Sequence, residues 1–150
     1  MYNWFECRAR YEKTLDNGMQ KKVTEPYLVD ALSHTEAEAR FIKEIKPYIS
    51  GEFEVVGIKP AKINEMFFNG NGDRWFKAKV NFITLDEKSG TEKKTPVTIY
   101  AQASDIGEAL SVVKKGMAGT LADYTIASLS ETAIMDVFPY EAESKAEEDE

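Results

Sequence analysis

The sequence has little of the residues on which most catalytic and metal sites depend. It contains one cysteine, Cys7, and one histidine, His34, among 150 residues. A single cysteine forms neither an internal disulfide nor a cysteine-based metal site, which favours a reducing compartment. No stretch approaches the ~18 apolar residues of a membrane span, and the start, MYNWFECRAR, lacks the apolar segment of a signal peptide. We therefore expect a cytoplasmic protein without membrane contact.

Negative charge is plentiful but unevenly placed. The net charge is −7, and the last ten residues, EAESKAEEDE, carry six acids and one lysine. This segment has no apolar periodicity, so we expect residues 141–150 to form a disordered acidic tail. The remaining chain is close to charge balance. The low isoelectric point therefore says little about what the folded surface binds.

The two tryptophans mark an internal repeat. WFECRARY, which starts at Trp4, returns as WFKAKVNF from Trp75, 71 positions later. With strand alternation, Phe5, Cys7 and Ala9 share one face, and the tryptophan shares the other with charged residues. The second copy divides in the same way. We expect one face of each strand to be core.

The order of the other signals repeats at the same spacing. Each copy has a hairpin turn, a return strand with an internal proline, a capped helix and a long last strand. Thr35 with Glu38, or Ser33 with Glu36, predicts the first cap, and Asp105 with Glu108 predicts the second. The final strands are expected at residues 52–68 and 124–138.

These patterns predict an α+β fold built by tandem duplication of a β-β-α-β unit. The two repeats span about residues 2–68 and 73–140, and we expect them to pack as a single domain over residues 1–140. The expected arrangement has about six antiparallel strands with two helices. Either one sheet carries both helices on one face, or two three-stranded sheets stack about a pseudo-twofold axis.

Several strings also resemble a known family. WFECRARYEKT, NGMQKKVTEPYLVDALS, TEAEAR, ITLDEKSG and SETAIMDVFPY are similar to the domain-of-unknown-function family 4494 of Bacteroides-type bacteria and their phages. The likeness covers about residues 1–140 and leaves out the acidic tail. It implies a compact intracellular domain. It implies no activity, cofactor or catalytic residue.

The best candidate site is the strand face on which each tryptophan is followed by cations. Its residues are Trp4, Arg8, Arg10, Trp75, Lys77 and Lys79. Aromatic rings stack on bases and cations neutralise phosphates, so this pattern predicts a non-enzymatic module that binds single-stranded nucleic acid. Lysines 21, 22, 93 and 94 on the return strands would extend the face. No cofactor is expected.

Three alternatives remain. The tryptophans could instead pack in the core, and the chain could be a protein–protein or self-association module with proline-marked edges. An enzyme ranks last; it would use Glu65 and Asp136, which recur in both repeats and could bind a metal. His34 lies in a capping sequence, and Cys7 aligns with Ala78, so both favour structural roles over catalysis.

Overall fold

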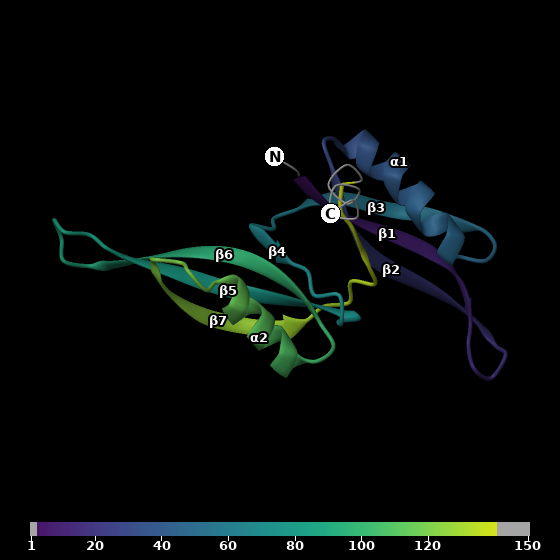
Figure 1. The fold of residues 1–150 in the computed structure, drawn as a ribbon. Helices are drawn as coiled ribbons and strands as arrows, with labels where there is room; N and C mark the ends of the chain where they lie inside the picture. Colours follow the sequence, from purple (N-terminus) through teal and green to yellow (C-terminus); the bar gives the residue numbers. More distant parts are fainter. Residues whose placement is uncertain (1–2, 141–150) are drawn as a thin grey trace, which may run out of the picture. The chain divides into compact units, whose positions relative to one another are not determined.

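The computed structural model describes residues 3–140 as eight strands, two α-helices and one short 3₁₀ helix (Figure 1). The first repeat contains β1 (Asn3–Thr14), β2 (Gln20–Ala31), α1 (His34–Ile45), η1 (Lys46–Tyr48), β3 (Phe53–Ala61) and β4 (Glu65–Phe67). The second contains β5 (Arg74–Leu85), β6 (Glu92–Ala103), α2 (Ile106–Gly116), β7 (Asp123–Glu131) and β8 (Val137–Phe138). The predicted α+β class with two helices is confirmed.

Each repeat begins with a long antiparallel hairpin. β1 pairs with β2, and β5 pairs with β6, each over twelve residue pairs. The turns contain Gly18 at φ 83° and Gly90 at φ 69°, a conformation that a side chain would strain. These turns fix the register, so Trp4 lies opposite Asp30 and Trp75 lies opposite Gln102.

The sheets differ from the prediction in their last strands. Each four-stranded sheet is mixed, with orders β3-β1-β2-β8 and β4-β6-β5-β7. β8 of the second repeat pairs in parallel with β2, and β4 of the first repeat pairs in parallel with β6. The expected all-antiparallel, six-stranded arrangement is therefore wrong. The predicted strands over residues 52–68 and 124–138 are each split in two, because the chain leaves one sheet and enters the other.

The two repeats thus exchange a short strand, and the chain divides into two compact units. Among the described residues the first unit contains 3–61 and 133–140, and the second contains Lys62–Thr132. The prediction that both repeats pack as one domain over residues 1–140 remains a prediction. The expected disordered tail, residues 141–150, lies outside the described residues.

One helix covers one face of each sheet, as the alternation predicts. In the first unit Phe5, Cys7 and Ala9 are buried under α1, which supplies Phe41 and Ile45. In the second unit the equivalent side chains of β5 are Phe76, Ala78 and Val80, and α2 supplies Ala109 and Val113. The opposite face of each sheet is the one that carries the cations.

The two helices begin after capping residues that lie 72 positions apart, Ser33 and Asp105. Ser33 Oγ accepts a hydrogen bond from Glu36 N at 3.1 Å, and Asp105 Oδ1 accepts one from Glu108 N at 2.8 Å. Of the two candidate pairs for α1, Ser33 with Glu36 is confirmed. Thr35 lies inside the helix, so the Thr35–Glu38 pair is wrong.

The C-terminal segment is held to the first unit by an arginine of α1. The guanidinium of Arg40 donates to the Asp30 carbonyl and, at 2.8 Å, to the Pro139 carbonyl. It also lies 5.3 Å from the ring centroid of Tyr140. Phe138 stacks on Tyr27 with 5.8 Å between ring centroids and enters the first core. The second repeat thus completes the sheet of the first unit.

Candidate nucleic-acid interface

The two tryptophans do not form matching surfaces. Trp4 is half-buried, whereas Trp75 is only 3% exposed. The ring of Phe68 meets Trp75 edge-on, with 5.7 Å between the ring centroids. The expectation that Trp75 lies on an exposed stacking surface is wrong, because its ring is enclosed. For Trp75 the alternative interpretation, a tryptophan that packs in the core, is the correct one.

The cations on this face of the first unit lie beside acids. Glu6 Oε2 lies 2.9 Å from Arg8 Nη2 and 3.7 Å from Lys59 Nζ, so one carboxylate serves two cations. Arg10 is exposed and lies opposite Glu54 in the register of β1 and β3. Such a face is nearly neutral, so it attracts a polyanion weakly.

In the second unit Lys77 and Lys79 lack such acids, although Arg74 at the start of β5 forms an ion pair with Glu131. Lys77 and Lys79 occupy the positions that Glu6 and Arg8 occupy in the first repeat, so a lysine replaces the bridging glutamate. Within residues 3–140 neither lysine forms an ion pair. Their neighbours on β7 are Ser130 and Ser128. The acids on the same face of this sheet, Glu92 and Asp123, lie toward the hairpin tip, opposite Leu85 and Ile83. The positive charge of Lys77 and Lys79 is therefore not compensated by a direct neighbour.

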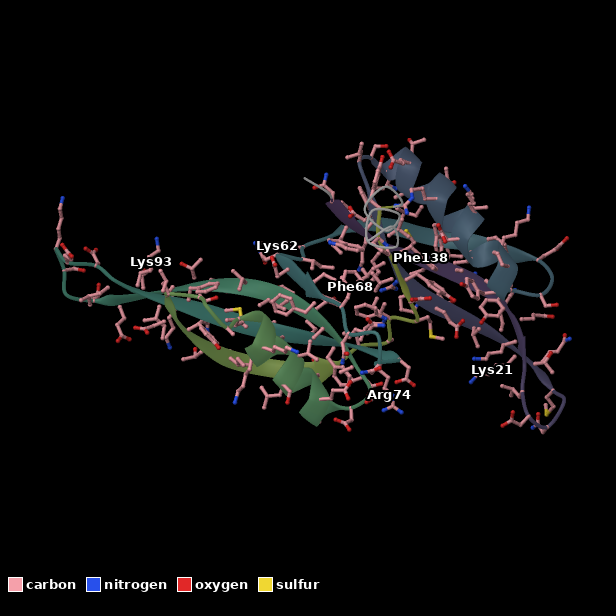
Figure 2. All side chains as sticks on the ribbon, viewed as in Figure 1. Lys21, Lys62, Phe68, Arg74, Lys93 and Phe138 are labelled. Atoms are coloured by element: carbon pink, nitrogen blue, oxygen red, sulfur yellow. The ribbon has the colours of Figure 1, made fainter. Side chains whose placement is uncertain are left out.

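An aromatic residue that the sequence analysis missed accompanies these lysines. Tyr100 of β6 lies directly opposite Lys77 and is half-buried. Phe68, labelled in Figure 2, is 53% exposed while its ring packs on Trp75. The hairpin turn at residues 87–90 implies the pairing of Tyr100 with Lys77. Extending the register from that turn would have found it.

The return-strand lysines divide between the two faces. Lys94 lies opposite Ile83 on β5, on the same side as Lys77 and Lys79, whereas Lys93 lies on the other side. We call Lys77, Lys79, Lys94 and Tyr100 the lysine face. In the first repeat Lys22 lies opposite Glu12 on the cation side of its sheet, and Lys21 does not. Lys21 and Lys93 lie toward the tips of their hairpins (Figure 2).

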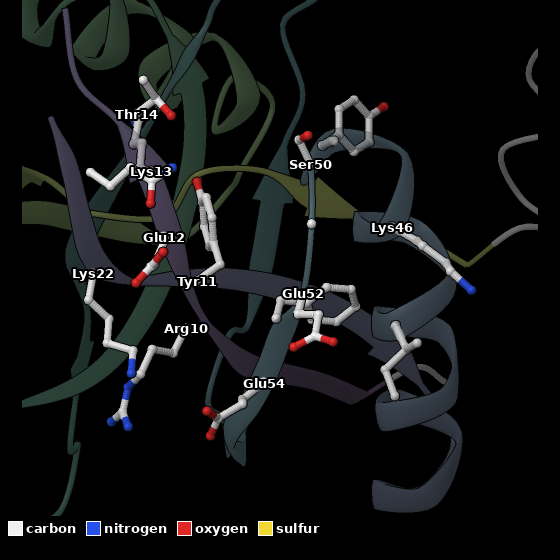
Figure 3. Close-up of a pocket in the computed structure, with 15 residues that line it drawn as sticks. Arg10, Tyr11, Glu12, Lys13, Thr14, Lys22, Lys46, Ser50, Glu52 and Glu54 are labelled. Carbon is white, nitrogen blue, oxygen red and sulfur yellow. The ribbon is translucent and has the colours of Figure 1, made fainter. Parts of the chain in front are cut away.

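A groove of about 1140 Å³ lies in the first unit, where β1 continues past the start of β3 (Figure 3). It contains both signs of charge. Its cations are Arg10, Lys13, Lys22 and Lys46, and its acids are Glu12, Glu52 and Glu54. Tyr48, at 71% exposure, is its most exposed aromatic residue. This mixture gives the groove less preference for an anion than the lysine face has.

The rare residues occupy structural positions. Cys7 is fully buried, and burial, followed by the charges of Glu6 and Glu38, raises the pKa of its thiol to about 12. A thiol in this state is a poor nucleophile at neutral pH. His34 is exposed, and its Nε2 donates to the carbonyl of Ile58 at 3.2 Å.

The recurring acids are not brought together within a unit. Glu65 is exposed on β4 in the second unit, while Asp136 lies in the first unit and its Oδ1 accepts from the N–H of Val137. In the described part of the chain no three side chains of the histidine, cysteine, aspartate and glutamate types are grouped as metal ligands would be. No helix in residues 3–140 has the length and apolar character of a membrane span.

The fold defines a duplicated α+β protein whose two repeats exchange a short strand. A family model described as "Domain of unknown function (DUF4494)" matches residues 3–140. The chain belongs to this family, which confirms the resemblance drawn from its sequence strings. No curated protein matches the chain significantly.

Proposed function

We propose that the protein is a non-enzymatic module that binds single-stranded nucleic acid on the lysine face of its second unit. The observation that supports this proposal is that Lys77 and Lys79 form no ion pair with any residue the structure describes, where the first repeat places an ion pair. Each phosphate that a lysine neutralises releases counterions from the strand, which favours binding at low salt. Trp75 is buried and has no part in contacting bases.

The aromatic contribution comes from other rings. Tyr100 lies beside Lys77, and Phe68 presents its exposed part next to Trp75. Stacking of a base on an aromatic side chain contributes about 1–3 kcal/mol. A sheet surface of this kind reads sequence poorly, because every base has a face that stacks. We therefore expect binding with strong salt dependence and weak sequence preference.

The test is a titration of a fluorescein-labelled single-stranded oligonucleotide, followed by anisotropy. The double substitution Lys77→Gln and Lys79→Gln should weaken binding about tenfold at low salt and reduce the slope of log K against log salt by about 1.4. The matched control is Arg8→Gln with Arg10→Gln, which removes the same charge from the first repeat. Arg8 is the equivalent of Lys79, and Arg10 lies two residues further along the same face. This control should change the affinity by less than about twofold, since Glu6 already neutralises Arg8 and Glu54 lies opposite Arg10.

Two results would contradict the proposal. Equal losses from the lysine pair and the arginine pair would mean that binding depends on total charge and not on this face. No binding by the wild-type protein at low salt would exclude the nucleic-acid function, because phosphate contacts are strongest there.

A module for protein–protein contact or self-association is the second candidate. It is favoured by a separate observation, the outer edge of β7, with which no strand pairs among the described residues. The two candidates differ in what they need from the protein. Nucleic-acid binding depends on the lysines, and strand addition depends on free backbone groups.

A further inference from the structure

β3 and β7 are equivalent outer strands of the two sheets. Each has nine residues, and within residues 3–140 each pairs only with the first strand of its own repeat. Each also contains a bulge at the same place, at Val56 and at Ala127. A free strand edge presents backbone groups that can pair with another strand, so proteins usually protect it. The shared bulge is one such protection and is common to both strands.

β3 has three further protections. Pro60 has no N–H to offer a new partner, and Lys59 and Glu54 place charges along the edge strand. In addition, His34 donates to the carbonyl of Ile58 at 3.2 Å. These features make β3 a poor template for an added strand.

β7 lacks the proline and the histidine contact, and its two charged residues, Asp123 and Glu131, lie at its ends, where Glu131 forms an ion pair with Arg74. The equivalents of Glu54, Lys59, Pro60 and His34 in the second repeat are Thr125, Ser130, Glu131 and Ile106. The seven residues Tyr124–Ser130 carry no charge. Among residues 3–140 no backbone hydrogen bond from a turn or loop reaches β7. One copy of a duplicated edge is thus protected, and the other has been left open to pairing.

The two sides of β7 indicate what kind of strand would fit. On the side of α2, Ile126 and Leu129 are only half-buried, and an apolar side chain beside them would complete their burial. On the other side Ser128 separates the outer edge from Lys79, and Ser130 separates it from Lys77. Strands lie about 4.8 Å apart, so an acid on an added strand could reach these lysines across the small serines.

We propose that the outer edge of β7 is a strand-addition site for an extended acidic segment of a partner protein. The segment alternates apolar side chains, which pack beside Ile126 and Leu129, with glutamate or aspartate side chains, which face Lys77 and Lys79. Backbone hydrogen bonds supply affinity in this mode, and the alternating side chains supply specificity. The inference rests on the second candidate function and does not depend on nucleic-acid binding.

The test uses the full-length protein and two labelled synthetic decapeptides, one alternating glutamate with valine and one alternating lysine with valine. Anisotropy should show saturable binding of the glutamate peptide and no binding of the lysine peptide. The double substitution Lys77→Gln and Lys79→Gln should lower the affinity for the glutamate peptide about tenfold. Lys114→Gln with Lys115→Gln removes the same charge from the end of α2 and should have little effect.

A second variant tests the strand edge itself. Thr125→Glu with Glu131→Pro installs on β7 the residues that β3 carries at the same positions, and it should abolish peptide binding. The lysines remain in place, so this variant should still bind the oligonucleotide if the protein binds one. If that variant does not fold, Ile106→His is a milder change, because Ile106 is exposed. A histidine there should recreate on β7 the contact that His34 makes on β3, and it should weaken binding of the glutamate peptide.

Three results would overturn the inference. Equal binding of both peptides would remove the charge argument, and wild-type binding by both edge variants would show that the edge is not the site. A dimer in light scattering that Thr125→Glu with Glu131→Pro abolishes would show that a second copy of the chain, and not an acidic partner, pairs with β7.

Discussion

Glu6 bridges Arg8 and Lys59 in the first unit, while the residue at its equivalent position in the second repeat is Lys77. The shared position lies on strands with the same register and the same buried face. The difference therefore changes the charge of the exposed face without changing the packing below it. Duplication preserved the fold and left these positions free to diverge.

Trp75 shows the limit of sequence patterns at the level of a single residue. Alternation correctly places it on the face opposite Phe76 and Ala78. It does not show that the ring of Phe68 meets it, because the sequence placed Phe68 at the end of a strand of the first repeat, whereas it follows β4, which joins the second sheet. The cations of this face could be predicted from the sequence, and the enclosure of the tryptophan could not.

Cys7 provides a prediction about alkaline pH. Burial raises the pKa of its thiol from 9.0 to about 12 in the folded protein, while the unfolded chain ionises near pH 9. The neutral thiol therefore supports stability fully below pH 9, and this support is lost as the pH rises toward 12. From pH 8 to pH 10 the wild-type free energy of unfolding should fall about 1 kcal/mol more than that of Cys7→Ala.

The measurement is urea unfolding of both proteins at the two pH values. Cys7→Ala is a conservative comparison, because Ala78 fills the equivalent site in the second repeat. Burial also raises the pKa of Tyr27 to about 12, which lowers stability at high pH in both proteins alike. Identical pH slopes for the two proteins would contradict the account of Cys7.

At the level of elements, the hairpins and helices were predictable because their signals are local. Three kinds of signal each depend on a few neighbouring residues: the turns before Gln20 and Glu92, the prolines in β2 and β6, and the caps at Ser33 and Asp105. The short strands β4 and β8 were not predictable. Each pairs in parallel with a strand about 30 to 110 residues away, and a run of two or three residues has no period of its own.

The caps give a prediction that separates two overlapping motifs. Ser33→Ala removes the hydrogen bond to Glu36 N and should destabilise the protein by about 1 kcal/mol. Thr35→Ala leaves the cap intact and should change stability by less than about 0.5 kcal/mol. Thermal or urea unfolding followed by circular dichroism measures both. A larger effect from Thr35 than from Ser33 would mean that the helix begins later than described.

At the level of the whole molecule, the reciprocal strand exchange ties each unit to the other repeat. β8 completes the sheet of the first unit, and β4 completes that of the second. The repeats align residue by residue here, since Val137 lies opposite Leu28 just as Met66 lies opposite Tyr100. Neither sheet is therefore complete within a single repeat.

Phe138 tests this exchange. Its ring is 8% exposed and stacks on Tyr27, so Phe138→Ala should destabilise the first unit by about 3 kcal/mol although the residue belongs to the second repeat. Hydrogen exchange should quicken at the amides of β1 and β2 and remain slow in β5 and β6. Phe67→Ala should give the opposite pattern. If hydrogen exchange after Phe138→Ala became faster only in β5 and β6, the assignment of β8 to the sheet of the first unit would be wrong.

The central functional claim is that the second unit binds a polyanion and the first does not. It is tested most directly by amide chemical shifts during titration with a single-stranded oligonucleotide at low salt. We expect shifts that saturate around Lys77, Lys79 and Tyr100, with little change around Arg8 and Arg10. Equal shifts on the equivalent strands of both units, or shifts confined to the first, would contradict it.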